Sequence, residues 1–168
     1  LIALLGMLVF ALAFLLLSRR RLDEERTKAL RALNASEEQY TWLVNAMPDV
    51  IVRLDLDGKI LFVNDQALFI SGYSREELIG QNMIQFVAPE DREKALQLSL
   101  LMMERRLGPQ EYRLILKNGR KVPFEINGDV LRDADGRPFG MVQVCRDIHE
   151  RKLVEESLRE SEDKFARI

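Results

Sequence analysis

Three turn dipeptides constrain the fold of this chain more than any other feature of its sequence. They are Asp57-Gly58, Asn118-Gly119 and Asp135-Gly136. Each joins two runs rich in branched or aromatic residues: 50–56 and 59–63, 111–116 and 121–127, and 130–132 and 138–146. Asp-Gly or Asn-Gly between two such runs is the strongest short signal for a β-hairpin. The three turns together predict an antiparallel sheet.

Helical segments separate the first hairpin from the later strands. The sequence predicts short helices over 65–70 and 75–78 and a longer helix over 89–106. The order is therefore two strands, then helices, then three strands. It predicts an α+β domain over 48–148, with a five-stranded antiparallel sheet and helices on one face.

The first residues differ in composition from the rest of the chain. Leu1 to Leu17 contains no charged residue, and Arg19, Arg20 and Arg21 follow it directly. We interpret 1–18 as a transmembrane helix that is cut short, because a bilayer core needs about 20 apolar residues. Basic residues after the span put the remainder of the chain on the cytoplasmic side of the inner membrane. A buried core helix is the alternative, which the arginines disfavour.

The segment 19–47 is predicted to be a helical linker. Apolar residues recur there at alternating four- and three-residue steps, the spacing of a coiled-coil seam, although a solvated single helix is also open. Ser36 and Gln39 resemble a capping box, which predicts a break in the helix near Asn34 to Ser36. Pro48 ends the helix. The seam positions are Leu22, Arg26, Ala29, Leu33, Ser36, Tyr40, Leu43 and Met47.

The last segment, 149–168, is predicted to be helical and repeats part of the linker. Ser161, Glu162 and Phe165 have the spacing of Ser36, Glu37 and Tyr40. Repeated spacing indicates an internal repeat. We expect this helix to lead into a second, similar domain.

Charge and cysteine content exclude several classes of protein. The charges of the 25 basic and 27 acidic residues nearly cancel. The chain therefore lacks the excess of basic residues that is typical of a nucleic-acid-binding protein. One cysteine excludes an intramolecular disulfide framework and a multi-cysteine zinc site. We expect no metal site, because the chain also holds only one histidine.

Several short motifs follow one another between residues 36 and 152, and their order matters as much as their residues. They are Ser36-Glu37-Glu38-Gln39-Tyr40, Asn64, Ser71-Gly72-Tyr73-Ser74-Arg75-Glu76-Glu77-Leu78-Ile79-Gly80, Asp147-Ile148 and Glu150-Arg151-Lys152. As a set they resemble the PAS family, S-box type. The resemblance implies the PAS fold and a homodimer formed through the flanking helices. It also implies a place in a membrane-bound bacterial or archaeal signalling protein, upstream of a histidine kinase or diguanylate cyclase domain in the same chain.

Two groups of candidate site residues follow from strand alternation and the resemblance. The expected ligand pocket consists of Phe69, Met83, Phe86, Tyr112, Phe124, Ile126, Gln143 and Cys145. The expected signal junction consists of Asn64, Asp147, Ile148 and His149. Asn64 can cap the following helix, and Asp147 can lock the last strand to the outgoing helix. His149 stands where the family has a threonine. The resemblance therefore does not say what takes the place of the threonine hydroxyl at this junction.

The cofactor stays unknown at this point. Gly80-Gln81-Asn82-Met83 resembles the flavin motif of light sensors, but Met83 replaces its cysteine and excludes adduct formation. Cys145 and Phe124 replace the Gln and Asn of flavin-binding relatives. Haem is disfavoured because 89–106 lacks histidine; Met102 and Met103 could bind iron but are more typical of a core.

No catalytic residue is predicted in this chain. His149-Glu150 is not followed by the sequence of a kinase phosphoacceptor site, and no phosphate loop, catalytic triad or zinc motif is present. We expect a sensory relay module that binds a small ligand or relays a transmembrane signal to an output domain, a histidine kinase or alternatively a diguanylate cyclase. The other hypothesis is a structural spacer that only dimerises its parent protein.

Overall fold

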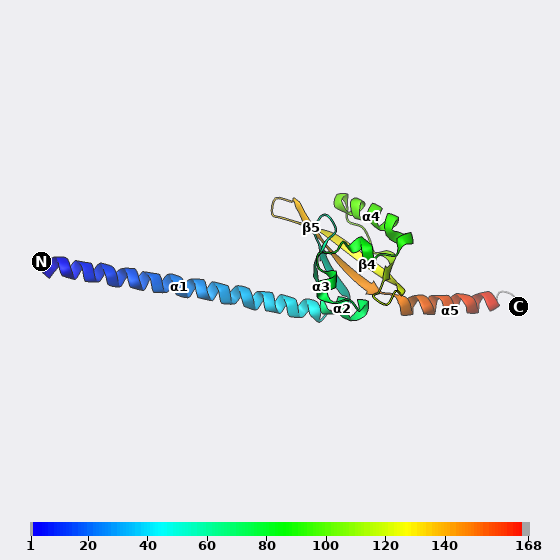
Figure 1. The fold of residues 1–168 in the computed structure, drawn as a ribbon, viewed down its shortest axis with the longest axis horizontal. Helices are drawn as coiled ribbons and strands as arrows, with labels where there is room; N and C mark the ends of the chain where they lie inside the picture. Colours follow the sequence, from blue (N-terminus) through cyan, green and yellow to red (C-terminus); the bar gives the residue numbers. More distant parts are fainter. Residues whose placement is uncertain (1, 166–168) are drawn as a thin grey trace. The chain divides into compact units, whose positions relative to one another are not determined.

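The computed structural model describes the backbone of residues 2–165 and the side chains of residue 19 and residues 23–164. The chain divides into two units, Leu1–Leu43 and Val44–Ile168, which we describe separately. Figure 1 shows the elements, coloured along the sequence. Their bounds are α1 Ile2–Asn45, β1 Val50–Leu54, β2 Ile60–Val63, α2 Asp65–Ser71, α3 Arg75–Leu78, η1 Met83–Phe86, η2 Pro89–Asp91, α4 Arg92–Glu104, β3 Gln110–Ile115, β4 Lys121–Arg132, β5 Pro138–Asp147 and α5 His149–Phe165.

Helix α1 is continuous over 44 residues, so the predicted break near Asn34 to Ser36 is wrong. Asn and Ser in a helix interior cost at most about 0.7 kcal/mol each relative to Ala. Strong helix formers on both sides outweigh that cost. The helix ends shortly before Pro48, as predicted. The linker 19–47 is therefore helical almost throughout, and its pairing as a coiled coil stays a prediction.

The predicted transmembrane segment, 1–18, falls on residues whose side chains are outside the described set. It therefore stays a prediction. Where side chains are described, no helix is long and apolar enough to cross a membrane.

The five strands form one antiparallel sheet, as the turns predicted, and their order is β2-β1-β5-β4-β3. The first and last strands of the domain meet at its centre, where Val50 pairs with Cys145. The turn glycines Gly58, Gly119 and Gly136 have φ of 81°, 82° and 78°, a conformation that side chains disfavour. Each predicted hairpin dipeptide therefore lies at a real turn.

One face of the sheet carries the core. Along β3 and β4, buried Tyr112 and Phe124 alternate with Glu111 and Glu125, which belong to the other face. Helices α2 and α4 contact the strands β1 and β4 respectively. The α+β class with helices over one face is confirmed. The buried residues of the core are Val50, Val52, Leu54, Ile60, Val63, Ala67, Leu78, Val87, Met102, Tyr112, Leu114, Val122, Phe124, Ile126, Met141 and Cys145.

Candidate functional site

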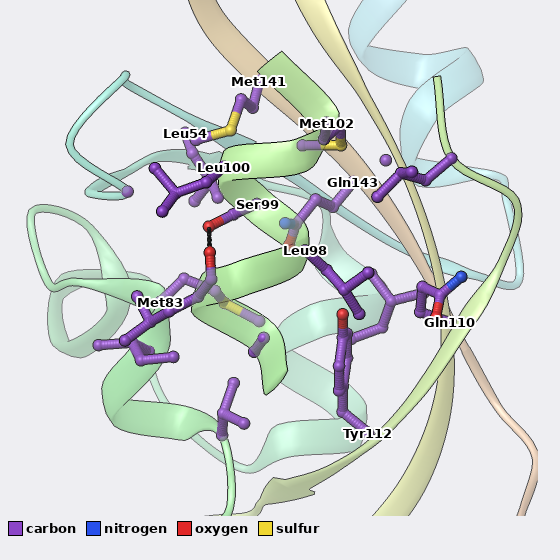
Figure 2. A pocket seen from close by; sticks show the side chains of 18 of the residues that line it. Leu54, Met83, Leu98, Ser99, Leu100, Met102, Gln110, Tyr112, Met141 and Gln143 are labelled. Carbon is purple, nitrogen blue, oxygen red and sulfur yellow. Dashed lines mark hydrogen bonds between the residues drawn. The ribbon is translucent and has the colours of Figure 1, made fainter. Parts of the chain in front are cut away.

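A cavity of about 450 Å³ lies between helix α4, η1, the β1–β2 turn and the inner face of the sheet. This volume is within the range of small-molecule sites, about 300–1,000 Å³. Figure 2 shows the side chains that converge on it from α4 and from the strands. The principal contributors are Leu54, Met83, Ala95, Leu98, Met102, Tyr112, Ile126, Gly128, Met141 and Gln143.

The cavity is mostly apolar and carries few polar groups. Ser99 donates its hydroxyl to the carbonyl of Leu96 at 2.8 Å, within its own helix. Tyr112 and Gln143 also line the cavity, and no hydrogen bond of either side chain is found among the described residues. Burial raises the pKa of Tyr112 to about 12, and the charge of Asp91 adds to the shift. The Tyr112 hydroxyl therefore keeps its proton and can donate.

Four of the eight predicted pocket residues line this cavity: Met83, Tyr112, Ile126 and Gln143. Phe86 and Phe124 line instead a second cavity of about 50 Å³ between the sheet and α2. Met83 borders both. At about 50 Å³ the smaller space is well below the range of small-molecule sites, about 300–1,000 Å³.

The structure does not bring Phe69 into either cavity. It lies on α2 with 83% of its surface exposed. Ala67, Ile70 and Ser71 face the core instead, at the three- and four-residue spacing of one helix face. Phe69, two residues after Ala67, is therefore on the opposite side, and the strand alternation that guided the prediction does not apply to a helix.

Cys145 is fully buried and lies outside the lining of both cavities. It pairs with Val50 on one side and Ile126 on the other, at the centre of the sheet. Burial, with a smaller contribution from Asp49, raises the pKa of its thiol to about 12. Cys145 is a core residue without a reactive thiolate.

The sequence analysis missed most of the apolar lining. Leu98 and Met102 of α4 face the cavity four residues apart, and Met141 lies two residues before Gln143 on the same face of β5. Helical and strand periodicity could have indicated these three residues. The same alternation places Gly128 two residues after Ile126 on β4, but it does not give the reason for a glycine: a Cβ there would lie 2.9 Å from the Met102 sulfur, so glycine leaves room for that side chain.

Asn64 connects three segments at the entry to the domain. It is fully buried, and its Oδ1 caps α2 by accepting from the Ala67 N–H at 3.3 Å, as predicted. The same oxygen accepts from the Ile51 N–H at 2.9 Å. Its Nδ2 donates to the carbonyls of Val44 at 3.2 Å and Asp49 at 2.9 Å. One side chain thus connects the last turn of α1 to the start of β1.

Asp147 caps the outgoing helix. Its Oδ1 accepts from the His149 N–H at 2.8 Å, so the predicted amide contact is present. Ile148 is buried, and its N–H donates to the Pro123 carbonyl at 3.1 Å. His149 itself is half-buried and begins α5. The strand therefore continues into the helix through a fixed, hydrogen-bonded step.

Ion pairs hold the first turn of α5 against the outer face of the sheet. Glu111 and Glu125 are directly opposite on β3 and β4, an arrangement that repels without a cation. Arg151 contacts both, at 2.9 Å to Glu111 and 3.1 Å to Glu125, and Lys152 lies 2.8 Å from Glu111. The contact with Lys152 chiefly lowers the pKa of Glu111, and that with Glu125 raises the pKa of Arg151. We call these four residues the α5 clasp.

The residues present do not fit a flavin. Phe124 and Cys145, at the positions where flavin-binding relatives carry amides, are buried and apolar, and they lie outside the larger cavity. Met102 is buried against the sheet, as expected for a core methionine. Among the described residues, no group of three or more His, Cys, Asp or Glu could hold a metal ion.

Comparison with protein families gives a match to the PAS fold over residues 38–148. The crystal structure of a PAS domain from Colwellia psychrerythraea has a TM-score of 0.63 and 25% identity, covering 67% of this chain and 97% of that one. The match therefore extends over nearly the whole of that domain.

Three curated relatives are longer proteins. The biofilm dispersion protein BdlA of Pseudomonas aeruginosa is 34% identical over 60% of this chain. The C4-dicarboxylate transport sensor protein DctS of Rhodobacter capsulatus is 31% identical, and the sensor protein kinase WalK of Staphylococcus aureus is 26% identical, each over 89% of this chain. The matched region is 25%, 22% and 33% of their respective lengths.

Proposed function

Because the chain belongs to the PAS family, we propose that it is a sensory relay module in which a small molecule in the 450 Å³ cavity, or a signal along α1, moves α5. Within the unit Val44–Ile168, hydrogen bonds connect the end of α1, the sheet and the start of α5. The module itself catalyses no reaction.

Strand β5 is the observation that carries this proposal. Its residues Met141 and Gln143 line the cavity, and Asp147, four residues further on, caps α5. A strand at the centre of a sheet is stiff, because both neighbours hydrogen-bond to it. A ligand that displaces Met141 or Gln143 would therefore shift the start of α5. Small shifts of packed elements are a common basis of signal relay.

The α5 clasp supports a movable output. Its residues are between one quarter and one half exposed, and exposed ion pairs stabilise only weakly because water and salt screen them. Beyond the step at Asp147 and Ile148, the ion pairs of the clasp thus hold the first turn of α5 against the sheet by only a small free energy. A ligand needs only a similar difference in affinity between two positions of the helix to change their populations.

We extend the proposal to the parent protein. Its output domain would be a histidine kinase, supported by the likeness to the sensor kinase WalK over 89% of this chain. A diguanylate cyclase is the alternative. The apolar run before Arg19 would tether the protein to the inner membrane, with this domain in the cytoplasm.

A homodimer through the flanking helices completes the proposal. Leu33, Tyr40 and Leu43 occupy apolar seam positions of α1 and are exposed in the single chain. A second α1 packed along this seam would bury them. Cross-linking of the purified chain should then trap dimers through cysteines placed on the seam, and not through cysteines placed opposite it.

The test fills the cavity from α4. Ala95 lines the cavity, whereas Gln97 is two residues away on the same helix and exposed. Ala95→Trp should abolish the response of the parent protein's output to its stimulus, and Gln97→Trp should not. Thermal denaturation checks that both variants fold. If Ala95→Trp folds and the output responds as in the unmodified protein, the cavity has no sensory role and the ligand-sensing part of the proposal is wrong; relay of a signal along α1 and the spacer hypothesis then remain.

A further inference from the structure

The side chains around the cavity carry almost no charge. Among the described residues that line it, Asp57 is the only Asp, Glu, Lys, Arg or His, and it is exposed on the β1–β2 turn. Lys94 lies 5.3 Å from the centre of the Tyr112 ring but donates to the Glu111 carbonyl at 3.2 Å, outside the lining. An anion placed in this space would have no cation to pair with.

Two polar side chains in the lining are free to bind a neutral group. Tyr112 can donate through its hydroxyl, and the Gln143 amide can donate and accept. Figure 2 shows both among apolar side chains such as Leu98 and Met102. A ligand with a hydroxyl, carbonyl or amide could satisfy these groups. A hydrocarbon would leave them without a partner.

Apolar side chains line much of the mouth of the cavity, with Asp57 as its charged residue. Leu96 and Leu100 line the cavity and yet are 52% and 72% exposed. They are one turn apart on α4, so they form one edge of the opening, and the exposed Leu56 also belongs to the lining. Apolar side chains at an opening in water favour an apolar ligand, because contact with it removes their surface from water.

From these three observations we infer that the cavity binds an uncharged, mostly apolar small molecule whose polar atoms contact Tyr112 and Gln143. This inference rests on the proposed function, since it specifies the ligand of the same site. It excludes carboxylates. The C4-dicarboxylates in the name of the relative DctS are therefore not ligands of this cavity.

The test compares three molecules that share an eight-carbon chain and differ in charge. The complete 168-residue chain is equilibrated with N-phenyl-1-naphthylamine, a neutral dye that fluoresces in apolar sites. Octan-1-ol, octanoate and octylammonium are then added as competitors. We expect octan-1-ol to displace the dye at a concentration at least about tenfold lower than either ion. Octanoate would lose its hydration without a cation in the lining, and the one carboxylate in the lining that octylammonium could pair with, Asp57, is exposed on the β1–β2 turn, away from the apolar interior.

Single substitutions test the polar contacts. Tyr112→Phe and Gln143→Leu should each lower the affinity for octan-1-ol roughly two- to tenfold, which is the effect of one net hydrogen bond. Neither substitution should change the affinity for octane. Gln97→Leu, on the exposed surface of α4, is the matched control and should change the affinity for neither octan-1-ol nor octane. Gln143→Lys should reverse the preference, so that octanoate binds better than octan-1-ol.

The outcomes separate the two proposals. If octanoate or octylammonium competes as well as octan-1-ol, the ligand class is wrong and the sensory cavity stands. If Tyr112→Phe and Gln143→Leu affect octane and octan-1-ol equally, the assigned contacts are wrong. If Ala95→Trp binds the dye and octan-1-ol as the unmodified chain does, neither molecule occupies the cavity and this inference is wrong. If neither dye nor octan-1-ol binds the unmodified chain, both this inference and the ligand-sensing part of the proposed function fail.

Discussion

Replacing Asn64 with alanine removes the contacts that connect the incoming helix to the sheet. Four backbone groups lose a partner. Two of them keep another: the Ala67 N–H also donates to the Asn64 carbonyl at 3.1 Å, and the Val44 carbonyl also accepts from Met47 at 3.4 Å. The Ile51 N–H and the Asp49 carbonyl have no other partner among the described residues.

The expected loss of stability follows from those two groups. Each buried group left without a partner costs about 1–3 kcal/mol, so Asn64→Ala should lower the free energy of unfolding by about 2–6 kcal/mol. A domain of this size is stable by only about 5–15 kcal/mol. The variant should therefore lose a large part of its stability.

Asn82→Ala is the matched control. Asn82 also caps a helix, accepting from the Ile84 N–H at 3.1 Å and donating to the Asp57 carbonyl at 2.8 Å, but it is only half-buried. Water can replace its contacts, so the loss should be about 0.5–2 kcal/mol. Urea unfolding, followed by near-ultraviolet circular dichroism, measures both. A loss at Asn64 no larger than that at Asn82 would refute this account of the junction.

Three further predictions concern pH, packing and thiol chemistry. The hydrogen bond with Arg113 lowers the pKa of Asp91 from 3.8 to about 2. The ionised Asp91 should therefore add about 1–2 kcal/mol to the free energy of unfolding, complete above about pH 4 and lost toward pH 2. Asp91→Asn should remove this part of the pH dependence of urea unfolding, and an unchanged pH profile in the variant would contradict the prediction. A Cβ at Gly140 would lie 2.7 Å from a backbone carbonyl oxygen of β1, so Gly140→Ala should destabilise the domain by about 1–3 kcal/mol in the same assay. Gly108 has open space around it, so Gly108→Ala should not destabilise the domain, and equal losses in the two variants would contradict the packing argument. Cys145 should resist a disulfide reagent at neutral pH in the folded chain and react fully in urea, and rapid labelling of the folded chain would show that its thiol is accessible.

The fold could be predicted because its signals are local. The dipeptides at Gly58, Gly119 and Gly136 require a backbone conformation that few residues accept, and the structure has positive φ at all three. The sheet order could not be read in the same way. The pairing of β1 with β5 joins the two ends of the domain, and no turn signal reports a contact between strands so far apart in sequence.

Strand alternation gave part of the cavity lining, and Met83 of η1 was also predicted, but Phe124 and Cys145 on the strands lie outside it. Alternation along β3, β4 and β5 identified Tyr112, Ile126 and Gln143. Phe69 was misplaced because the direction of a side chain on a seven-residue helix depends on which face the core covers. The roles of Asn64 beyond its cap, and of Arg151 between two glutamates, arise from contacts between distant segments that sequence spacing does not contain.

Amide hydrogen exchange in the first turn of α5 tests the central claim most directly. Ala95→Trp fills the cavity without touching α5, and Gln97→Trp adds the same side chain to the exposed surface of α4. The claim predicts that filling the cavity changes the exchange rates of the amides of 149–152 and that the surface variant does not. Altered exchange in α4 and β5 with unchanged rates over 149–152 would contradict a relay from the cavity to the helix.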